Sequence, residues 1–301
     1  MDMRILFVTS NRLGDAILST GLLDYLIRTY PDARITVVCG PVAEGVFARM
    51  PNRERTIVLE KRPYGLHWLP LWAKTVTTCW DLVVDIRASA LSWLVPTRRR
   101  AVMRKAAGHK TEQLAAMLNL HPPPLPVAWI APEDYARAAS LLPPDRRIIV
   151  LAPTANWAPK VWPADRFAAA FQALAAGTAQ AVVIAGPGDT ERAMAAPLLA
   201  ALPGSIDLIG RLSLPEVAAC LSRASLFIGN DSGLMHLGAA AGAPTIGLFG
   251  PTSAAEYGPV GQRARAVLAA GGRMDDITVQ QVVDAAADIQ TPARTMPGRR
   301  A

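Results

Sequence analysis

The sequence predicts an α/β protein of two doubly wound domains in tandem, with a cleft between them. Short buried apolar runs such as Arg4–Thr9 and Leu82–Ile86 alternate with segments of helical periodicity. This order is typical of parallel sheets with helices on both faces. The length of 301 residues, of which 51% are hydrophobic, accommodates two domains of about 150 residues each.

The elements of the first half follow from apolar runs and the residues that interrupt them. Buried strands are expected at Arg4–Thr9, Arg34–Cys39, Thr56–Leu59 and Leu82–Ile86. Helices are expected at Asp15–Tyr30, Val42–Met50 and Trp68–Thr78. In the first helix, Ile17, Leu18 and Leu22 recur on helical positions. Pro31 ends that helix because proline cannot continue it.

A proline-rich stretch separates the two halves. Pro122–Pro124 and Pro126 cannot continue a helix, and a helix follows at Glu133–Leu142. Pro143 and Pro144 end that helix in turn. We therefore place the domain boundary between residues 146 and 147, which gives domains at 1–146 and 147–290.

The second half repeats the alternation. Strands are expected at Ile148–Ala152, Ala181–Ala185, Ile206–Leu208, Leu226–Ile228 and Thr245–Phe249. Helices are expected at Ala164–Ala176, Thr190–Ala201, Leu214–Ala224, Ser232–Ala241 and Thr278–Ala287. Residues 291–301 are basic, contain Pro and Gly, and are predicted to be a flexible tail. Ligands of open α/β sheets bind beyond the carboxyl ends of the strands, which here are expected to border the cleft.

Positive charge is concentrated in the first half. Of the formal net charge of +7, residues 1–146 hold 19 Lys and Arg against 13 Asp and Glu, and residues 147–301 hold 12 against 11. The densest basic cluster consists of Arg98, Arg99, Arg100, Arg104, Lys105 and Lys110. Such a cluster attracts an anionic lipid, nucleic acid or phosphorylated ligand, or is simply a solvated face. No recognition helix or aromatic RNA platform is apparent, so a nucleic-acid partner is not expected.

The composition also bears on compartment and metals. Cys39, Cys79 and Cys220 lie too far apart for a metal site or a disulfide framework, which fits a reducing cytosol. No signal-peptide core and no run of about 20 apolar residues is present. We therefore expect a cytoplasmic protein. No Asp-x-Asp pair occurs, so no metal site and no cofactor are expected.

The segment Leu226–Thr252 predicts an anion site. A strand feeds the polar turn Gly229–Gly233, and a helix of small residues starts there. The first N–H groups of a helix have no intrahelical partner, and the helix dipole adds partial positive charge, so a phosphate is the usual ligand. His236 lies in the first helical turn and would face that ligand. The alternative is that Asp231 and Ser232 only cap the helix.

Other polar residues also follow predicted strands. Asp15, after Gly14, is either a functional carboxylate or a helix-start residue that complements the dipole. Lys160, in the loop Pro153–Pro163, is either a phosphate ligand or an exposed loop lysine. Glu191, after the turn Gly186–Asp189, is more simply a first-turn residue. G-x-G-x-x-G is absent after the first strand, which argues against a dinucleotide-binding dehydrogenase.

Several motifs occur together in a known order. They are the strand and loop leading to Gly14-Asp15, the strand Asp81–Asp85, Lys160-Val161-Trp162-Pro163, Gly210–Leu214, Asp231–His236, Leu248–Thr252 and Met274–Val279. With these motifs the chain resembles, over nearly its whole length, the bacterial lipopolysaccharide heptosyltransferases of glycosyltransferase family nine. That family has the GT-B fold of two Rossmann-like domains.

The resemblance implies an inverting, metal-independent transfer of heptose from ADP-heptose to a lipopolysaccharide-core or related glycan. Domain 1–146 would bind the acceptor and domain 147–290 the nucleotide-sugar donor. Asp15 matches the proposed general base, and Lys160 matches the lysine that holds the donor phosphates. The implied donor-binding residues are Thr154, Lys160, Glu191, Gly210, Leu212, Asp231, Ser232, Gly233 and His236. The implied acceptor-binding residues are Asn11, Arg12, Arg62, Arg87 and Arg99.

The chain departs from the family pattern in places that bear on its substrates. Ala269–Arg273 stands where members often carry cysteines, and Asn156-Trp157 replaces small polar residues. Two alternatives stay open: transfer of another nucleotide-activated sugar to a different cell-surface glycan, and a non-catalytic nucleotide- or glycan-binding relative. The expected partners are a nucleotide sugar and an anionic glycolipid or glycan, with peripheral contact at the inner face of the plasma membrane.

Overall fold

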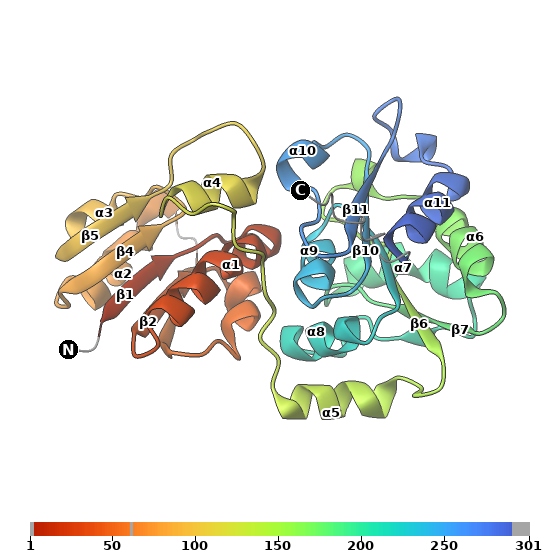
Figure 1. The fold of residues 1–301 in the computed structure, drawn as a ribbon, viewed down its shortest axis with the longest axis horizontal. Helices are drawn as coiled ribbons and strands as arrows, with labels where there is room; N and C mark the ends of the chain where they lie inside the picture. Colours follow the sequence, from red (N-terminus) through yellow and green to blue (C-terminus); the bar gives the residue numbers. More distant parts are fainter. Residues whose placement is uncertain (1–2, 61–62, 291–301) are drawn as a thin grey trace, which may run out of the picture.

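The chain folds into two lobes, each built on one parallel sheet (Figure 1). A computed structural model describes residues 3–60 and 63–290. The first half of the chain forms one lobe, and the second half forms the other. The predicted α/β class with two tandem Rossmann-like units is confirmed. The predicted tail at 291–301 lies outside the described residues.

The first sheet has five strands in the order β3-β2-β1-β4-β5. Its strands are β1 (Arg4–Val8), β2 (Arg34–Cys39), β3 (Arg53–Val58), β4 (Trp80–Asp85) and β5 (Thr97–Val102). The helices of this lobe are α1 (Leu13–Thr29), α2 (Trp68–Thr75), α3 (Leu91–Leu94) and α4 (Lys110–Ala116), with 3₁₀ turns η1 (Pro41–Phe47) and η2 (Pro63–Gly65). Alternate residues of β1 enter different cores. Phe7 packs toward α1, whereas Leu6 packs toward α2 and α3.

The second sheet has six strands in the order β11-β10-β9-β6-β7-β8. Its strands are β6 (Arg147–Ala152), β7 (Ala179–Val183), β8 (Ile206–Asp207), β9 (Leu226–Asn230), β10 (Thr245–Phe249) and β11 (Ala264–Leu268). Its helices are α5 (Pro132–Leu141), α6 (Ala164–Ala175), α7 (Asp189–Ala201), α8 (Leu214–Ser222), α9 (Gly233–Ala240), α10 (Ala254–Tyr257) and α11 (Val279–Gln290), with 3₁₀ turns η3 (Ala158–Lys160) and η4 (Met274–Asp276).

The structure adds elements that the apolar pattern did not predict. Strand β5 was missed because Arg98, Arg99 and Arg100 are exposed on this edge of the sheet. Strand β11 was missed because it also has no run of buried apolar residues: only Val267 of its five residues is buried. The helix predicted at Val42–Met50 is instead the 3₁₀ segment η1. Among the described residues, no helix is long and apolar enough to cross a membrane.

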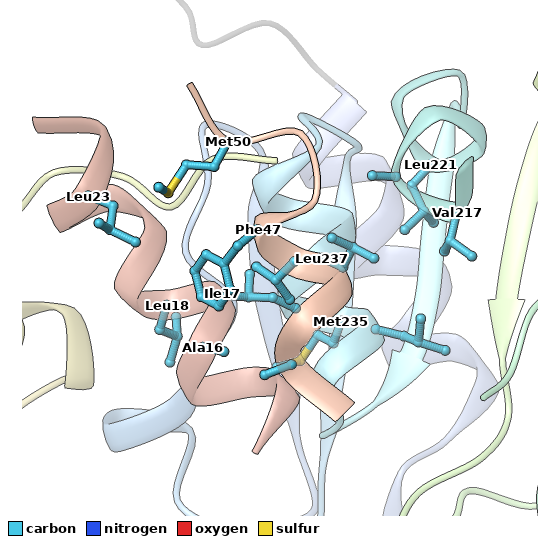
Figure 2. Packing of buried hydrophobic residues seen from close by; sticks show 14 of the residues in the cluster. Ala16, Ile17, Leu18, Leu23, Phe47, Met50, Val217, Leu221, Met235 and Leu237 are labelled. Atoms are coloured by element: carbon cyan, nitrogen blue, oxygen red, sulfur yellow. The ribbon is translucent and has the colours of Figure 1, made fainter. Parts of the chain in front are cut away.

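A continuous apolar core joins the two lobes (Figure 2). From the first half, Ile17 of α1 and Phe47 of η1 enter this core. From the second half, Met235 and Leu237 of α9 and Val217 of α8 enter it. The boundary at residues 146/147 stays a prediction, although α5, which precedes it, packs against α8. The lobes are therefore held together by core-like packing rather than by a flexible tether alone.

The connector before α5 fastens the first lobe to the second. Its Val127 N–H donates to Thr20 Oγ1 of α1 at 2.8 Å, and its Ala128 N–H donates to the Ala240 carbonyl of α9 at 3.1 Å. Gly21 makes room for this passage, because a Cβ there would lie 2.6 Å from the Pro124 carbonyl oxygen. The connector thus ties α1 to α9, the two helices that border the candidate site.

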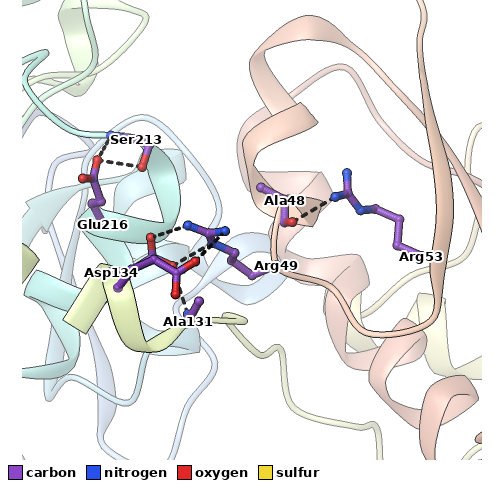
Figure 3. Close-up of polar contacts among 8 residues, drawn as sticks. Ala48, Arg49, Arg53, Ala131, Asp134, Ser213 and Glu216 are labelled. Atoms are coloured by element: carbon purple, nitrogen blue, oxygen red, sulfur yellow. Dashed lines mark hydrogen bonds and ion pairs between the residues drawn. The ribbon is translucent and has the colours of Figure 1, made fainter. Parts of the chain in front are cut away.

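An ion pair also spans the lobes (Figure 3). Arg49, after η1, donates from Nε and Nη2 to the two carboxylate oxygens of Asp134, each at 2.9 Å. Asp134 Oδ2 also accepts from the Ala131 N–H at 2.9 Å, which caps α5. The bond from Arg49 is the main cause that lowers the pKa of Asp134. This carboxylate therefore supports both the helix start and the contact between lobes.

We expect Asp134→Asn to lower the free energy of unfolding by about 1–3 kcal/mol at pH 7, because a buried acceptor of charged hydrogen bonds is weakened. The lowered pKa means that this stabilisation is present above the ordinary Asp range and lost as the pH falls through the folded-state value. The difference in the free energy of unfolding between wild type and variant should therefore decrease below about pH 4. Urea unfolding at pH values from about 3 to 7 measures this difference. A difference that does not change with pH would contradict the role of the charge.

Candidate functional site

The candidate site lies where the strand order reverses in each sheet. In the second sheet, this point falls between β6 and β9, and in the first between β1 and β4. Loops that leave the carboxyl ends of such strands diverge and leave room for a ligand. The β6 and β9 loops carry Lys160 and Asp231, and the β1 and β4 loops carry Asn11 and Arg87. The fold thus brings four residues predicted from the sequence to two matching positions.

Lys160 and Asp231 form the charged centre of the second-lobe site. Lys160 Nζ lies 2.6 Å from Asp231 Oδ2, and both side chains are largely buried. Thr252, after β10, donates its hydroxyl to the same oxygen at 2.8 Å. The lysine is therefore not a free loop residue, because the carboxylate of Asp231 fixes its ammonium at the carboxyl edge of the sheet.

Asn230, the last residue of β9, positions the loop that carries Lys160. Its side-chain oxygen accepts from the Trp162 N–H at 3.1 Å, and its amide nitrogen donates to the Pro153 carbonyl at 2.9 Å. Trp162 is itself buried and donates from Nε1 to the Ile277 carbonyl at 3.0 Å. Asn230 was not among the site residues predicted from the sequence. Its role depends on the pairing of β9 with β6, which joins residues about 80 positions apart.

The start of α9 carries two buried polar atoms without partners. Ser232 precedes the helix, but its hydroxyl makes no capping bond, and neither Ser232 Oγ nor His236 Nδ1 has a hydrogen-bond partner within the described part of the chain. Buried polar groups are almost always hydrogen-bonded, and unpaired ones point to a missing ligand or water. Capping alone therefore does not explain Ser232.

His236 meets the first lobe directly. A Cβ on Gly14 would lie 2.9 Å from His236 Cδ2, and a Cβ on Gly233 would lie 2.7 Å from Leu13 Cδ2. A glycine on each side thus lets the starts of α1 and α9 touch. From the sequence, Gly14 was expected to allow a tight turn or the close approach of a ligand. The structure shows that it brings Asp15 next to the helix start predicted to bind an anion.

Burial lowers the pKa of His236 to about 4; the charge of Asp231 opposes this shift, and the charges of His109 and Lys160 add to it. The imidazole is therefore neutral at physiological pH. A neutral imidazole has one nitrogen that donates and one that accepts. It can bond to a ligand oxygen without adding a charge to the site.

The lowered pKa of His236 predicts a pH-dependent stability. Below the unfolded value, near 6.5, the unfolded chain binds a proton at this residue and the folded chain does not, so stability falls as the pH drops from 6.5 towards 4. The free energy of unfolding should fall by about 3 kcal/mol at most over this range. Denaturation from pH 4 to 7 should show that His236→Asn reduces this slope. The exposed His121→Asn is the control and should keep it; equal slopes in both variants would contradict the assignment.

Asp15 lies in the first turn of α1, facing the second lobe. Ser10 donates its hydroxyl to Asp15 Oδ2 at 3.1 Å, and Ser10 Oγ accepts from the Arg12 N–H. Burial is the main cause that raises the pKa of Tyr257, the last residue of α10 in the second lobe, and the charge of Asp15 is the next. The carboxylate is only partly buried. It is therefore oriented by Ser10, yet still accessible.

The other predicted acceptor residues divide into two groups. Arg87 donates from Nη1 to Asn11 Oδ1 at 3.0 Å, which joins the loop after β4 to the loop that leads to Asp15. The side chain of Arg12 is exposed at the same loop. Arg99 stands apart, since it pairs with Leu82 in the middle of β5, away from the carboxyl edge. Arg62 lies outside the described residues.

The remaining donor residues line the β6, β7 and β8 end of the same edge. Thr154 follows β6 and is buried. Gly210 has φ of +66°, and a Cβ there would lie 3.2 Å from Pro187 Cα, so the loops after β7 and β8 touch at a glycine. Glu191, in the first turn of α7, lies against Gly186 and Gly188. Leu212 packs on the edge of the core. These residues form a strip along the edge, next to Lys160.

Among the described residues, no group of three or more His, Cys, Asp and Glu side chains is arranged to hold a metal ion. The positive groups beside the start of α9 are instead Lys160 and the backbone N–H groups of the helix. The arrangement can bind a diphosphate between a lysine and a helix start, with a carboxylate from the other lobe alongside.

Comparison with known proteins identifies the family of the chain. Residues 82–286 match the family model for glycosyltransferase family 9 (heptosyltransferase). The chain is 25% identical over 309 residues to lipooligosaccharide heptosyltransferase 2 of Haemophilus influenzae, with 87% of each chain covered. It is 35% identical over 106 residues to lipopolysaccharide heptosyltransferase 3 of Escherichia coli, which covers 35% of this chain and 31% of that one.

Solved structures agree in fold. A family 9 glycosyltransferase from Veillonella parvula superposes with a TM-score of 0.78 at 22% identity, covering 96% of this chain and 97% of the other. The ADP-heptose lipopolysaccharide heptosyltransferase II of Escherichia coli gives 0.77 at 23% identity, covering 96% and 98%. Because the family match spans well over half of the sequence and the two-lobed fold agrees, the chain belongs to glycosyltransferase family 9, the heptosyltransferases.

Proposed function

We propose that this protein transfers a heptose from ADP-heptose to a lipopolysaccharide-core acceptor, with inversion and without a metal ion. The observation that carries the proposal is the contact between Gly14 and His236. Because Asp15 follows Gly14, this contact supports a site in which the carboxylate of one lobe works together with Lys160 and the start of α9 from the other. A proton acceptor and a group that stabilises a diphosphate are what glycosyl transfer requires.

The diphosphate of the donor is proposed to bind at the start of α9. The free N–H groups of Gly233 and Leu234 would donate to its oxygens, and Lys160 would supply a full positive charge. A phosphate would be repelled by Asp231, so we assign this carboxylate to positioning the lysine. The unpartnered Ser232 hydroxyl and His236 Nδ1 would then find their partners in the ligand. These groups stabilise the charge that grows on the departing ADP.

The nucleotide is proposed to lie along the strip formed by Thr154, Glu191, Gly210 and Leu212. Gly210 is exposed and carries no side chain, so its backbone would be open to a flat ring. ADP is favoured by solved structures of Escherichia coli heptosyltransferase WaaC with ADP and with ADP-2-deoxy-2-fluoro heptose, which share this fold at 20% and 19% identity.

Asp15 is proposed to act as the general base. It would accept the proton of the acceptor hydroxyl while that oxygen bonds to the anomeric carbon and the bond to ADP breaks. Asp15 comes from the first lobe and the diphosphate site from the second, so attack and departure take place on opposite sides of the sugar. Such a single displacement inverts the anomeric centre. Asn11 and Arg87, which are bonded to each other in the loops after β1 and β4, would orient an anionic acceptor.

A panel of nucleotide sugars tests the donor. At a concentration 100 times its dissociation constant, ADP-heptose should stabilise the fold by about 2.7 kcal/mol, which raises the melting temperature by about 4 °C. EDTA should not reduce this shift or the rate of ADP release. A shift with UDP-sugars alone would favour the alternative donor class. Binding without nucleotide release for any acceptor would instead favour a non-catalytic relative.

A further inference from the structure

The outer face of the first lobe exposes large apolar side chains. Helices α2 and α3 cover the sheet there through Leu71 and Leu91, which are buried. Their other sides leave Leu69, Trp93 and Leu94 63%, 67% and 60% exposed, and Trp72 40% exposed. We call the set of these four residues the α2–α3 patch. Apolar side chains gathered in this way mark an interaction site, whereas scattered single ones need no explanation.

A groove runs through the α2–α3 patch. It has a volume of about 490 Å³ and is lined by Trp68, Leu69, Trp72, Ser89, Ala90, Leu91 and Leu94. Trp72 Nε1 donates to the Leu94 carbonyl at 3.0 Å, which ties α2 to α3 and fixes the shape of the groove. The groove is therefore a formed feature of the lobe rather than an effect of loosely placed side chains.

The segments that surround the α2–α3 patch in the sequence carry basic residues and almost no acidic ones. Residues 86–111 contain seven Lys and Arg and no Asp or Glu, and residues 63–80 contain no acidic residue. Arg100 lies 5.5 Å from the ring centroid of Trp93, and Arg99, Arg104 and Lys105 are exposed on and after the edge strand β5. Arg98 is also exposed there, but it pairs with Asp81 at 3.3 Å. Tryptophan beside basic residues, around an apolar surface, is the composition that binds the interface of an anionic bilayer.

The patch is also continuous with the candidate acceptor site. Arg87 lies 5.1 Å from the ring centroid of Trp68, which lines the groove, and it also bonds to Asn11 in the loop that leads to Asp15. Ser89, also in the groove, donates its N–H and hydroxyl to Asp85 at the end of β4. A molecule anchored in a membrane below the patch would thus meet the first-lobe site at the end of the groove.

We propose that the α2–α3 patch docks the protein on a bilayer rich in anionic lipids, so that a membrane-anchored acceptor reaches Asp15 from that side. The inference rests on the proposed function for its acceptor, and it adds the surface through which the protein reaches a membrane. The docking itself needs neither the donor nor the chemistry, and it can be tested without them.

Sedimentation with vesicles tests the docking directly. The full chain should bind vesicles of phosphatidylglycerol and phosphatidylethanolamine, and bind phosphatidylcholine vesicles at least tenfold more weakly. The double variant Trp93→Ser/Leu94→Ser should bind the anionic vesicles at least tenfold more weakly than wild type. As a matched control, Tyr135→Ser/Leu268→Ser removes two exposed apolar side chains of the second lobe and should bind like wild type. All four residues are exposed, so the variants should fold.

The electrostatic part is tested by salt, since 0.5 M NaCl should weaken binding of wild type by screening. Equal binding of wild type and the patch variant would overturn the proposal, as would no binding to anionic vesicles. Light scattering tests the alternative that the patch binds a second copy of the chain. A dimeric wild type and a monomeric patch variant that bind vesicles equally would assign the patch to that dimer.

Activity separates this proposal from the proposed function. The patch variant should transfer sugar to a water-soluble acceptor at the wild-type rate, and lose at least tenfold in rate only when the acceptor is embedded in vesicles. If wild type binds anionic vesicles through the patch but transfers no heptose, the docking stands and the proposed reaction fails. An equal loss of rate on the soluble acceptor would show that the variant damages the site, and would overturn the assignment of the patch to membrane docking.

Discussion

Replacing Asp15 with Asn should lower kcat by about 10²–10⁴-fold while leaving donor affinity unchanged. The amide cannot accept the proton of the acceptor hydroxyl, yet its oxygen can still accept the hydrogen bond from Ser10. Within the described part of the chain, Asp15 bonds to Ser10 and Lys160 to Asp231, so the second-lobe site should keep its geometry in this variant. The measurement is the rate of ADP release, together with ADP affinity by calorimetry.

Asp24→Asn is the matched control for this variant. Asp24 lies on the same helix, α1, and pairs with Arg28 at 2.7 Å on the exposed side. The control should retain wild-type turnover, because surface pairs contribute little to stability and this one is remote from the lobe junction. If Asp15→Asn turns over as fast as this control, Asp15 is not the general base.

Replacing Lys160 with Met should lower kcat by about 10²–10³-fold, the loss typical of removing one donor that stabilises a developing negative charge. Donor binding should weaken as well, since the lysine would also contact the ground-state diphosphate. Lys74→Ala, on the exposed side of α2, removes a lysine far from this edge of the second sheet and should leave both quantities unchanged.

A second substitution distinguishes loss of the charge from damage to the fold. Lys160→Met leaves the largely buried carboxylate of Asp231 without its cation, which is destabilising by itself. Combining it with Asp231→Asn removes that unpaired charge and should restore stability without restoring the rate. If Asp231 acts only by holding Lys160, Asp231→Asn should cost nothing further in rate within the Lys160→Met background. A rate restored in the double variant would refute the role of the lysine.

Much of the second lobe's site was predictable because its signals are local. The strand Thr245–Phe249 is found as predicted, and α9 begins within one residue of its predicted start. An apolar run followed by a polar turn needs no knowledge of the rest of the chain. The same local pattern located Asp15 at the start of α1.

The unpredicted features depend on contacts between distant segments. Asn230 could not be recognised because its partners, Pro153 and Trp162, are about 70 residues away. The pairing of Gly14 with His236 joins residues of different lobes. The solvent exposure of a side chain cannot be read from the sequence either, so Trp93 and Leu94 could not be distinguished there from core residues. Strand β5 was lost because three successive arginines contradict the apolar pattern on which strand prediction relies.

The apolar core that joins α1, η1, α8 and α9 has a consequence for engineering. Enzymes with two lobes invite the exchange of a whole lobe between relatives, to combine one donor specificity with another acceptor specificity. Here each lobe completes the hydrophobic packing of the other, around Ile17, Phe47 and Leu237. A hybrid would leave voids or clashes at that seam, each costing about 1–3 kcal/mol. New substrate combinations in this scaffold should therefore be sought through loop substitutions, with the seam between lobes retained from a single parent.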